Sequence, residues 1–149
     1  MDSLTSERFI TETGTRLLVQ VPHEAAQRVL QAIVAADPLT YGDYDQVAFT
    51  TSAGVQQFRS LPGGRNPETE AAVTVPCVEL QVFTEATGQK LEPILRAIYH
   101  AHPYEEPVIQ LLPALRTRHI RGMDEDNPNR FWNRETPDWV PIAHRPKST

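Results

Sequence analysis

The sequence predicts an α+β sandwich in which two helices cover one face of an antiparallel sheet. Short runs of β-branched and apolar residues alternate with two amphipathic segments, and prolines stand at most of the boundaries between them. The order of these segments is strand, helix, strand, strand, helix, strand. This is the split βαβ order of a ferredoxin-like sandwich, so we expect one βαββαβ domain over residues 15–113.

The first strand and the first helix meet at a proline. Residues 16–21 (RLLVQV) are rich in branched apolar side chains, which is typical of a strand, and Pro22 ends the run. Proline suits the first turn of a helix, where its missing N–H costs nothing. Apolar residues then recur with helical spacing, at Ala26, Val29 or Leu30, Ile33 and Ala36. We therefore expect an amphipathic helix that ends at Asp37 and Pro38.

The middle of the chain predicts three strands. Residues 46–51 and 55–61 are β-prone runs separated by Ser-Ala-Gly, so we expect them to pair with each other as a hairpin. Residues 62–67 (PGGRNP) are dense in proline and glycine and predict a loop. Residues 77–83 (CVELQVF) alternate between apolar and polar side chains, which indicates a half-buried strand.

The second helix and the last strand are also bounded by prolines. We expect the helix to begin near Glu92, because Pro93 suits a first turn, and to end at Pro103. Residues 107–112 (PVIQLL) are apolar and predict the final strand, which Pro113 closes. Apolar side chains on both sides of this strand indicate that the second face of the sheet is also covered, by oligomer formation or by the C-terminal segment.

Composition narrows the class of protein. The 149 residues carry a net charge of −5, and residues 1–113 hold 7 basic and 14 acidic side chains, which argues against a nucleic-acid partner. The single cysteine, Cys77, excludes a disulfide within the chain and a CxxC zinc pair, and its apolar neighbours predict that it is buried. Because no run approaches the roughly 20 apolar residues that span a bilayer, we expect a cytoplasmic protein that does not bind membranes.

Two segments flank the predicted domain. Residues 1–14 predict a polar N-terminal tail. Residues 114–149 contain four prolines but also Phe131 and both tryptophans, Trp132 and Trp139. Such rings bury on the order of 150–250 Å² each when they dock, so we expect this extension to pack on the body or on a neighbouring subunit.

Residues 101–107 (AHPYEEP) are the chemically densest segment. Neutral imidazole together with carboxylate suits zinc or copper, so a surface divalent-metal site is one hypothesis, with His102 and Glu105 as ligands and His100 as a weaker one. A small ligand bound by His102, Tyr104, Glu105 and Glu106 is a related hypothesis. Two alternatives remain open: His102 caps the second helix while the glutamates bond to turn amides or to a neighbouring subunit, or His102 and a glutamate share acid–base catalysis.

The segment AHPYEEP, residues 41–60 (YGDYDQVAFTTSAGVQQFRS) and the turn Gly64-Arg65-Asn66-Pro67 together resemble one family. They look like the small domain inserted in YqfO-type proteins of the Nif-three-like family, which also occurs alone and is similar to CutA and, more distantly, to PII signalling proteins. The resemblance covers about residues 16–113. It implies a CutA/PII-like ferredoxin fold that is commonly trimeric. The family's paired metal ions belong to a larger domain with no counterpart in this sequence.

Three functions are consistent with these observations. The resemblance and the acidic, motif-poor body favour a non-enzymatic module that binds a small ligand or a divalent metal as a CutA-like oligomer. A small hydrolase or isomerase using His102 with Glu105 or Glu106 is the second, although the sequence has no nucleophile elbow, phosphate-binding glycine loop or zinc-peptidase motif. The third is a protein-interaction adaptor that docks through its C-terminal extension.

Overall fold

The computed structural model describes residue 2 and residues 4–146. Its principal elements are β1 (Phe9–Val21), α1 (His23–Ala36), β2 (Ala48–Thr50), β3 (Gly54–Phe58), β4 (Val73–Thr84), α2 (Glu92–Ala101) and β5 (Ile109–His119). Two single 3₁₀ turns, η1 (Gly88–Leu91) and η2 (Ile142–His144), complete them. None of the helices in this described part of the chain is long and apolar enough to cross a membrane.

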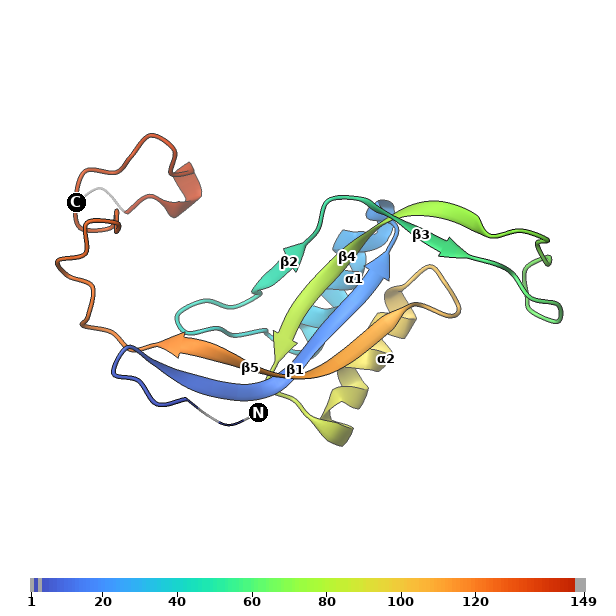
Figure 1. The fold of residues 1–149 in the computed structure, drawn as a ribbon, viewed down its shortest axis with the longest axis horizontal. Helices are drawn as coiled ribbons and strands as arrows, with labels where there is room; N and C mark the ends of the chain where they lie inside the picture. Colours follow the sequence, from blue (N-terminus) through green and yellow to red (C-terminus); the bar gives the residue numbers. More distant parts are fainter. Residues whose placement is uncertain (1, 3, 147–149) are drawn as a thin grey trace.

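The sheet has the strand order β2-β4-β1-β5, and every pair in it is antiparallel. Both helices lie on one face of this sheet (Figure 1). Because each helix connects two strands that are separated by one other strand, this arrangement is the βαββαβ ferredoxin-like sandwich. The fold class predicted from the order of elements is therefore confirmed.

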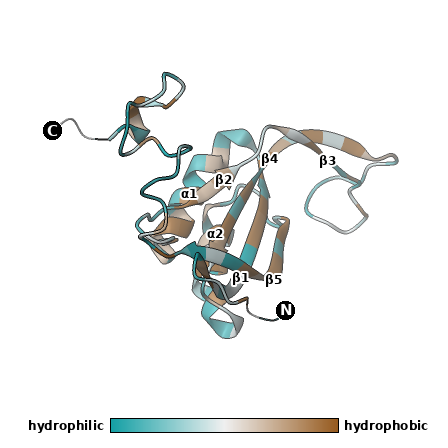
Figure 2. Cartoon of the chain, turned by 60° about the vertical axis from the view of Figure 1, so that its left-hand side comes forward, coloured by the Kyte–Doolittle hydropathy of each residue, from teal (hydrophilic) through white to brown (hydrophobic). Residues whose placement is uncertain are grey.

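The hydrophobic core lies between the sheet and the two helices (Figure 2). Alternate residues of the two central strands point into it, as the period of two along a strand requires. They are Leu17, Val19 and Val21 of β1 and Val78, Leu80 and Val82 of β4. Val29 and Ile33 of α1 and Ile94 and Ile98 of α2 meet them from the helix layer.

The predicted hairpin between residues 46–51 and 55–61 is wrong. Both runs pair with β4 instead, Thr50 opposite Leu80 and Gly54 opposite Cys77. The first run therefore has one residue more than β4 between these pairs, which is a β-bulge. Thr51 anchors the bulge, because its N–H donates to the Glu79 carbonyl (3.1 Å) and its hydroxyl accepts from the Glu79 N–H (2.9 Å). β2 and β3 thus form one interrupted edge strand.

The first and last strands are longer than the sequence predicted. β1 begins at Phe9, and β5 continues through Pro113 to His119, so the ladder between them crosses both boundaries expected for the domain. Pro113 does not end β5 because this strand pairs only with β1 within the described chain. An edge strand accommodates proline where its nitrogen faces away from the ladder.

Gly14 lies at the point where the β1–β5 ladder leaves the core. A Cβ atom at this position would overlap the Thr84 carbonyl oxygen and lie 2.6 Å from Cζ of Phe83. The end of β4 and the Phe83 ring therefore pass directly over the Gly14 backbone. Only a residue without a side chain allows this approach.

β3 and the first residues of β4 form a two-stranded arm, residues 54–77, that projects beyond the two helices (Figure 1). The extensive contacts of β3 are with β4 alone. Three large apolar residues of the arm, Val55, Phe58 and Leu61, are exposed. The arm is thus held to the body of this chain mainly through the continuity of β4.

Candidate functional site

His102 is the residue that ends α2, where its backbone N–H donates to the Ile98 carbonyl (2.9 Å). Its ring is buried and both of its nitrogens are occupied. Nδ1 accepts the N–H of Tyr104 (3.0 Å), and Nε2 lies 2.8 Å from the carbonyl oxygen of Gln20. Since a carbonyl can only accept, the ring proton is on Nε2. His102 therefore connects the C-terminal end of α2 to the C-terminal end of β1.

Glu105 binds Arg65, which comes from the loop between β3 and β4. Arg65 Nε pairs with one carboxylate oxygen and Nη2 lies 3.3 Å from the other. The hydrogen bond from this guanidinium lowers the pKa of Glu105. Two of the segments that carried the family resemblance, AHPYEEP and Gly-Arg-Asn-Pro, are thus joined by one exposed ion pair.

The metal site predicted from His102, Glu105 and His100 stays a prediction. Coordination by His102 would have to replace one of its two hydrogen bonds, and Glu105 is paired with Arg65. His100 and Glu106 are exposed. Within residue 2 and residues 4–146, no group of three His, Cys, Asp or Glu side chains is close enough to hold a metal ion. Zinc or copper binding would therefore need a ligand from elsewhere.

Replacing His102 with alanine is expected to lower the free energy of unfolding by about 2 kcal/mol, because the Gln20 carbonyl and the Tyr104 N–H would both lose their partner. Urea unfolding followed by circular dichroism measures this change. His100→Ala, at an exposed position two residues earlier, is the control and should leave stability within about 0.5 kcal/mol.

Equal stability of the two histidine variants would contradict this structural role. Elemental analysis of the same proteins, purified without chelators or a histidine tag, tests the metal prediction. A stoichiometric metal that is lost only in His102→Ala would support a metal site in residues 101–107.

The face of the sheet opposite the helices carries a second cluster, which the sequence did not reveal. Arg116 of β5 lies between two aromatic rings, its guanidinium carbon 4.4 Å from the Tyr41 centroid and 4.1 Å from the Phe83 centroid. Its Nε donates to Glu12 of β1 (2.8 Å), and Nη2 donates to the Thr40 carbonyl (2.8 Å). The side chains of Glu12 and Arg116 are only 8% and 14% exposed. This cation is consequently held in one fixed position.

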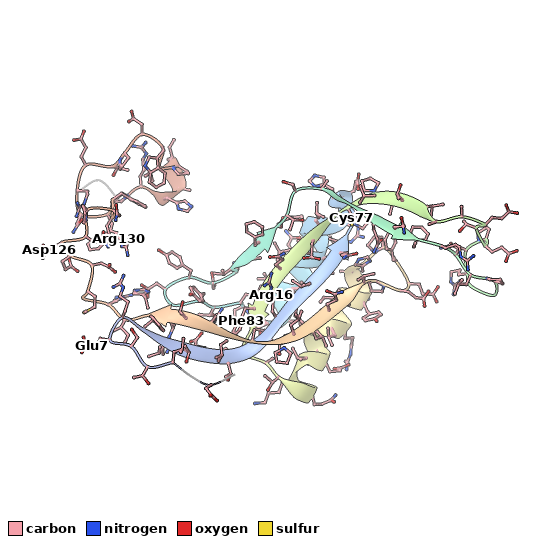
Figure 3. All side chains as sticks on the ribbon, in the orientation of Figure 1. Glu7, Arg16, Cys77, Phe83, Asp126 and Arg130 are labelled. Atoms are coloured by element: carbon pink, nitrogen blue, oxygen red, sulfur yellow. The ribbon has the colours of Figure 1, made fainter. Side chains whose placement is uncertain are left out.

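A hollow of about 500 Å³ opens beside Arg116, between β2, β4, β5 and the loop that precedes β2. The side chains that give it its chemistry are Arg16, Tyr41, Phe49, Gln81, Phe83 and Arg116. Arg16 and Phe83 are paired residues of neighbouring strands, and Figure 3 labels both on the sheet. Arg16 is exposed and donates to Gln81 Oε1 (3.1 Å). The hollow therefore combines aromatic walls with guanidinium groups.

Residues 101–107 line neither this hollow nor the smaller one of about 150 Å³ beside Cys77. Cys77 is buried, as the sequence predicted. The signal that could have revealed the larger hollow was weak, because its residues are spread from Arg16 to Arg116. Thr11, Thr13 and Thr15 occupy alternate positions around Glu12, and this β-prone spacing was the signal for a strand in what was expected to be a polar tail.

The C-terminal extension touches the body near its beginning. Asp124 binds Arg8 (2.6 Å) and Arg130 (3.0 Å), and the hydrogen bond from Arg8 lowers the pKa of Asp124. Further on, Phe131 and Trp139 form an edge-to-face pair with centroids 6.0 Å apart. The segment that carries this pair, residues 131–139, lies away from the sandwich in Figure 1. Residues 147–149 of the predicted extension lie outside the described residues.

No family model matches the sequence, but individual relatives exist. The chain is 32% identical over 104 residues to a Halalkalibacterium halodurans protein called "GTP cyclohydrolase 1 type 2 homolog". The alignment covers 69% of this chain and 27% of that protein. This chain thus spans less than a third of the length of the curated relatives that it matches.

Solved structures extend this relationship to the fold. A Bacillus cereus protein related to NIF3 superposes with a TM-score of 0.58 and 23% identity. The match covers 76% of this chain and 29% of the Bacillus cereus chain. CutA1 from Oryza sativa matches 70% of this chain and 82% of its own, with a TM-score of 0.50 and 18% identity. The sequence is therefore distantly similar to the curated relative, and the predicted likeness to NIF3-related and CutA proteins is confirmed at the level of the fold.

Proposed function

We propose that this chain is a non-enzymatic regulatory module that assembles with copies of itself and binds a small ligand. The observation that carries the proposal is the β3–β4 arm, which leaves the body of its own chain with apolar residues exposed. Its relatives support the proposal, because they are Nif-three-like and CutA-like proteins. The family resemblance implies three subunits around one axis.

The arm has little to stabilise it within one chain. An isolated two-stranded ribbon is marginal in water, because it has no second layer to cover its side chains. Val55 is 71% exposed, although it lies within β3 rather than in a loop. A neighbouring copy would cover this arm. In a closed symmetric assembly every subunit makes the same contact, so the arm of each copy is covered by another copy. The arm then contributes its apolar surface to the assembly and not to the monomer.

The second face of the sheet is suited to the same assembly. Two polar side chains near its centre are already bonded within the chain: Gln81 bonds to Glu79 (3.0 Å) and Gln20 bonds to Gln56 of the arm (2.9 Å). Polar groups with partners cost little when a subunit covers them. The Gln20–Gln56 bond also fixes the direction in which the arm leaves the body.

Val55→Asp is expected to break the assembly, because it places a charge in the apolar surface of the arm while a residue so exposed contributes little to the folded monomer. Light scattering of the full chain measures the mass. The control is Gln31→Asp on the exposed side of α1, which adds the same charge away from the arm and should keep the wild-type mass. If Val55→Asp, with an unchanged circular dichroism spectrum, kept the wild-type mass, the arm would not be the interface.

A further inference from the structure

We propose that the C-terminal extension of a neighbouring copy fills the hollow beside Arg116, with Trp139 against the aromatic walls and Asp138 beside Arg16. The inference rests on the proposed assembly and names a contact that closes the second face of the sheet. Three observations support it: the hollow is partly apolar, the extension projects from its own body, and the two surfaces match in chemistry.

The hollow lies on the face that the proposed assembly covers, so its occupant belongs to a neighbouring copy. Its volume is about 500 Å³, and its lining includes two exposed apolar side chains, Val47 (39%) and Phe49 (63%). A flat neighbouring surface would cover this space without filling it, and the lining would lose packing contacts. A part of the neighbouring copy that projects from its own body can enter the hollow and make these contacts.

Residues 137–146 form such a projecting part. In Figure 1 they lie away from the sandwich, at the opposite end of the molecule from the arm. The segment is folded on itself, because the Val140 N–H donates to the Pro137 carbonyl (3.1 Å) and Arg145 Nε donates to the Val140 carbonyl (3.1 Å). Val140 is buried, whereas Trp139 and Ile142 are 71% and 88% exposed. An ordered segment thus presents an indole ring that its own chain leaves uncovered.

The extension does not fill the hollow of its own chain. Residues 120–146 line no part of it. The beginning of the extension is instead held beside the start of β1, where Asp124 binds Arg8 (2.6 Å). A neighbouring copy can supply the hollow, since in a closed ring each copy gives one extension and accepts another.

The chemistry of Asp138 and Trp139 matches that of the hollow. The indole can pack on the exposed Phe49 ring, and such aromatic pairs stabilise a contact beyond the area that they bury. Arg16 donates to the neutral Gln81 (3.1 Å), and among the described residues no carboxylate pairs with it. Its guanidinium has donors to spare in a planar fork, which suits the two oxygens of a carboxylate. Asp138 is exposed and directly precedes the ring, so it can provide that carboxylate.

Fluorescence of Trp139 tests this inference. Trp132→Phe leaves Trp139 as the only tryptophan of the full chain. Acrylamide quenching measures its accessibility, with N-acetyl-tryptophanamide as the free reference. We expect a quenching constant roughly threefold or more below that of the reference, because docking removes the indole from water. A constant close to that of the reference would overturn the inference.

Two variants of the hollow locate the contact. In the same background, Phe49→Ser and Arg16→Gln should each raise the quenching of Trp139 toward that of the reference. Tyr99→Ser and Arg96→Gln are the matched controls, because they remove an exposed ring and an exposed guanidinium of α2, in the other layer. Both controls should keep the ring shielded. Shielding that is unchanged in either hollow variant would also overturn the inference.

A mixed assembly identifies the chain that supplies the hollow. Both chains carry Trp132→Phe; the first also carries Phe49→Ser, and the second also carries Trp139→Ala. Only the first chain has a tryptophan, and only the second has an intact hollow. When the second is co-expressed in excess, Trp139 of the first chain should be shielded again. Continued exposure in the mixed oligomer would contradict docking on a neighbouring copy.

The result is separable from the test of assembly, because light scattering reports the mass and quenching reports the docking. An oligomer in which Trp139 is quenched like the reference overturns this inference and leaves the assembly standing. The same result is expected if the arm of a neighbouring copy fills the hollow instead. A monomer whose Trp139 is shielded would mean that the extension docks on its own chain, and it would overturn both proposals.

Discussion

Replacing Gly14 with alanine is expected to lower the free energy of unfolding by about 3 kcal/mol. The new Cβ would overlap the Thr84 carbonyl oxygen, which is backbone and cannot move without shifting the end of β4. It would also lie 2.6 Å from Cζ and 2.8 Å from Cε1 of Phe83. Moving that ring would disturb its cation–π contact with Arg116, so the variant would lose this contact in addition to the energy of the steric clash.

Urea unfolding of Gly14→Ala beside Gly64→Ala measures this effect. Gly64 is the appropriate control because a Cβ there meets its nearest atom, the Leu61 carbonyl oxygen, at an ordinary 3.6 Å. We expect Gly64→Ala to stay within about 0.5 kcal/mol of the wild type. Equal stability of the two variants would show that β4 does not pass over Gly14 as described.

Replacing Glu12 with alanine is expected to lower the free energy of unfolding by about 2–3 kcal/mol, because the largely buried Arg116 guanidinium would lose its carboxylate partner. Glu12 also pairs with Arg118, whose side chain is partly exposed, and water solvates that charge when Glu12 is removed. The loss of stability is therefore smaller than for a fully buried ion pair. Thermal or urea unfolding at moderate salt measures it. Glu85→Ala, which removes an exposed carboxylate elsewhere, is the control.

A double variant separates the ion pair from general packing. In Glu12→Ala with Arg116→Met the unpaired charge is gone and an apolar chain remains between the Tyr41 and Phe83 rings. We expect this double variant to be more stable than the sum of the two single losses predicts. Strictly additive losses would mean that Glu12 and Arg116 do not act as a pair.

The fold class was predictable because its evidence is local. The spacing of Val29 and Ile33 sets the buried face of α1, and the alternation in residues 77–83 sets the buried face of β4. The pairing of residues 46–51 and 55–61 was not predictable in this way. Their short Ser-Ala-Gly connection suggested a hairpin, whereas the bulge at Thr51 lets both runs follow β4.

The candidate site was harder to predict because its partners are distant in sequence. Pro103 correctly indicated where the second helix ends, since α2 stops at Ala101. The partner of His102, however, is the Gln20 carbonyl, 82 residues away, and no local pattern announces it. Arg116 and Glu12 are 104 residues apart and were assigned to the extension and the tail. Only the register of β1 with β5 brings them together.

The mass of the unmodified full chain in solution tests the central claim most directly, since the proposed function depends on an arm that one chain leaves uncovered. Light scattering at low micromolar concentration should give about three times the chain mass of 16.8 kDa. A stable species of 16.8 kDa across the concentration range would contradict the claim that copies of this chain cover each other's arms.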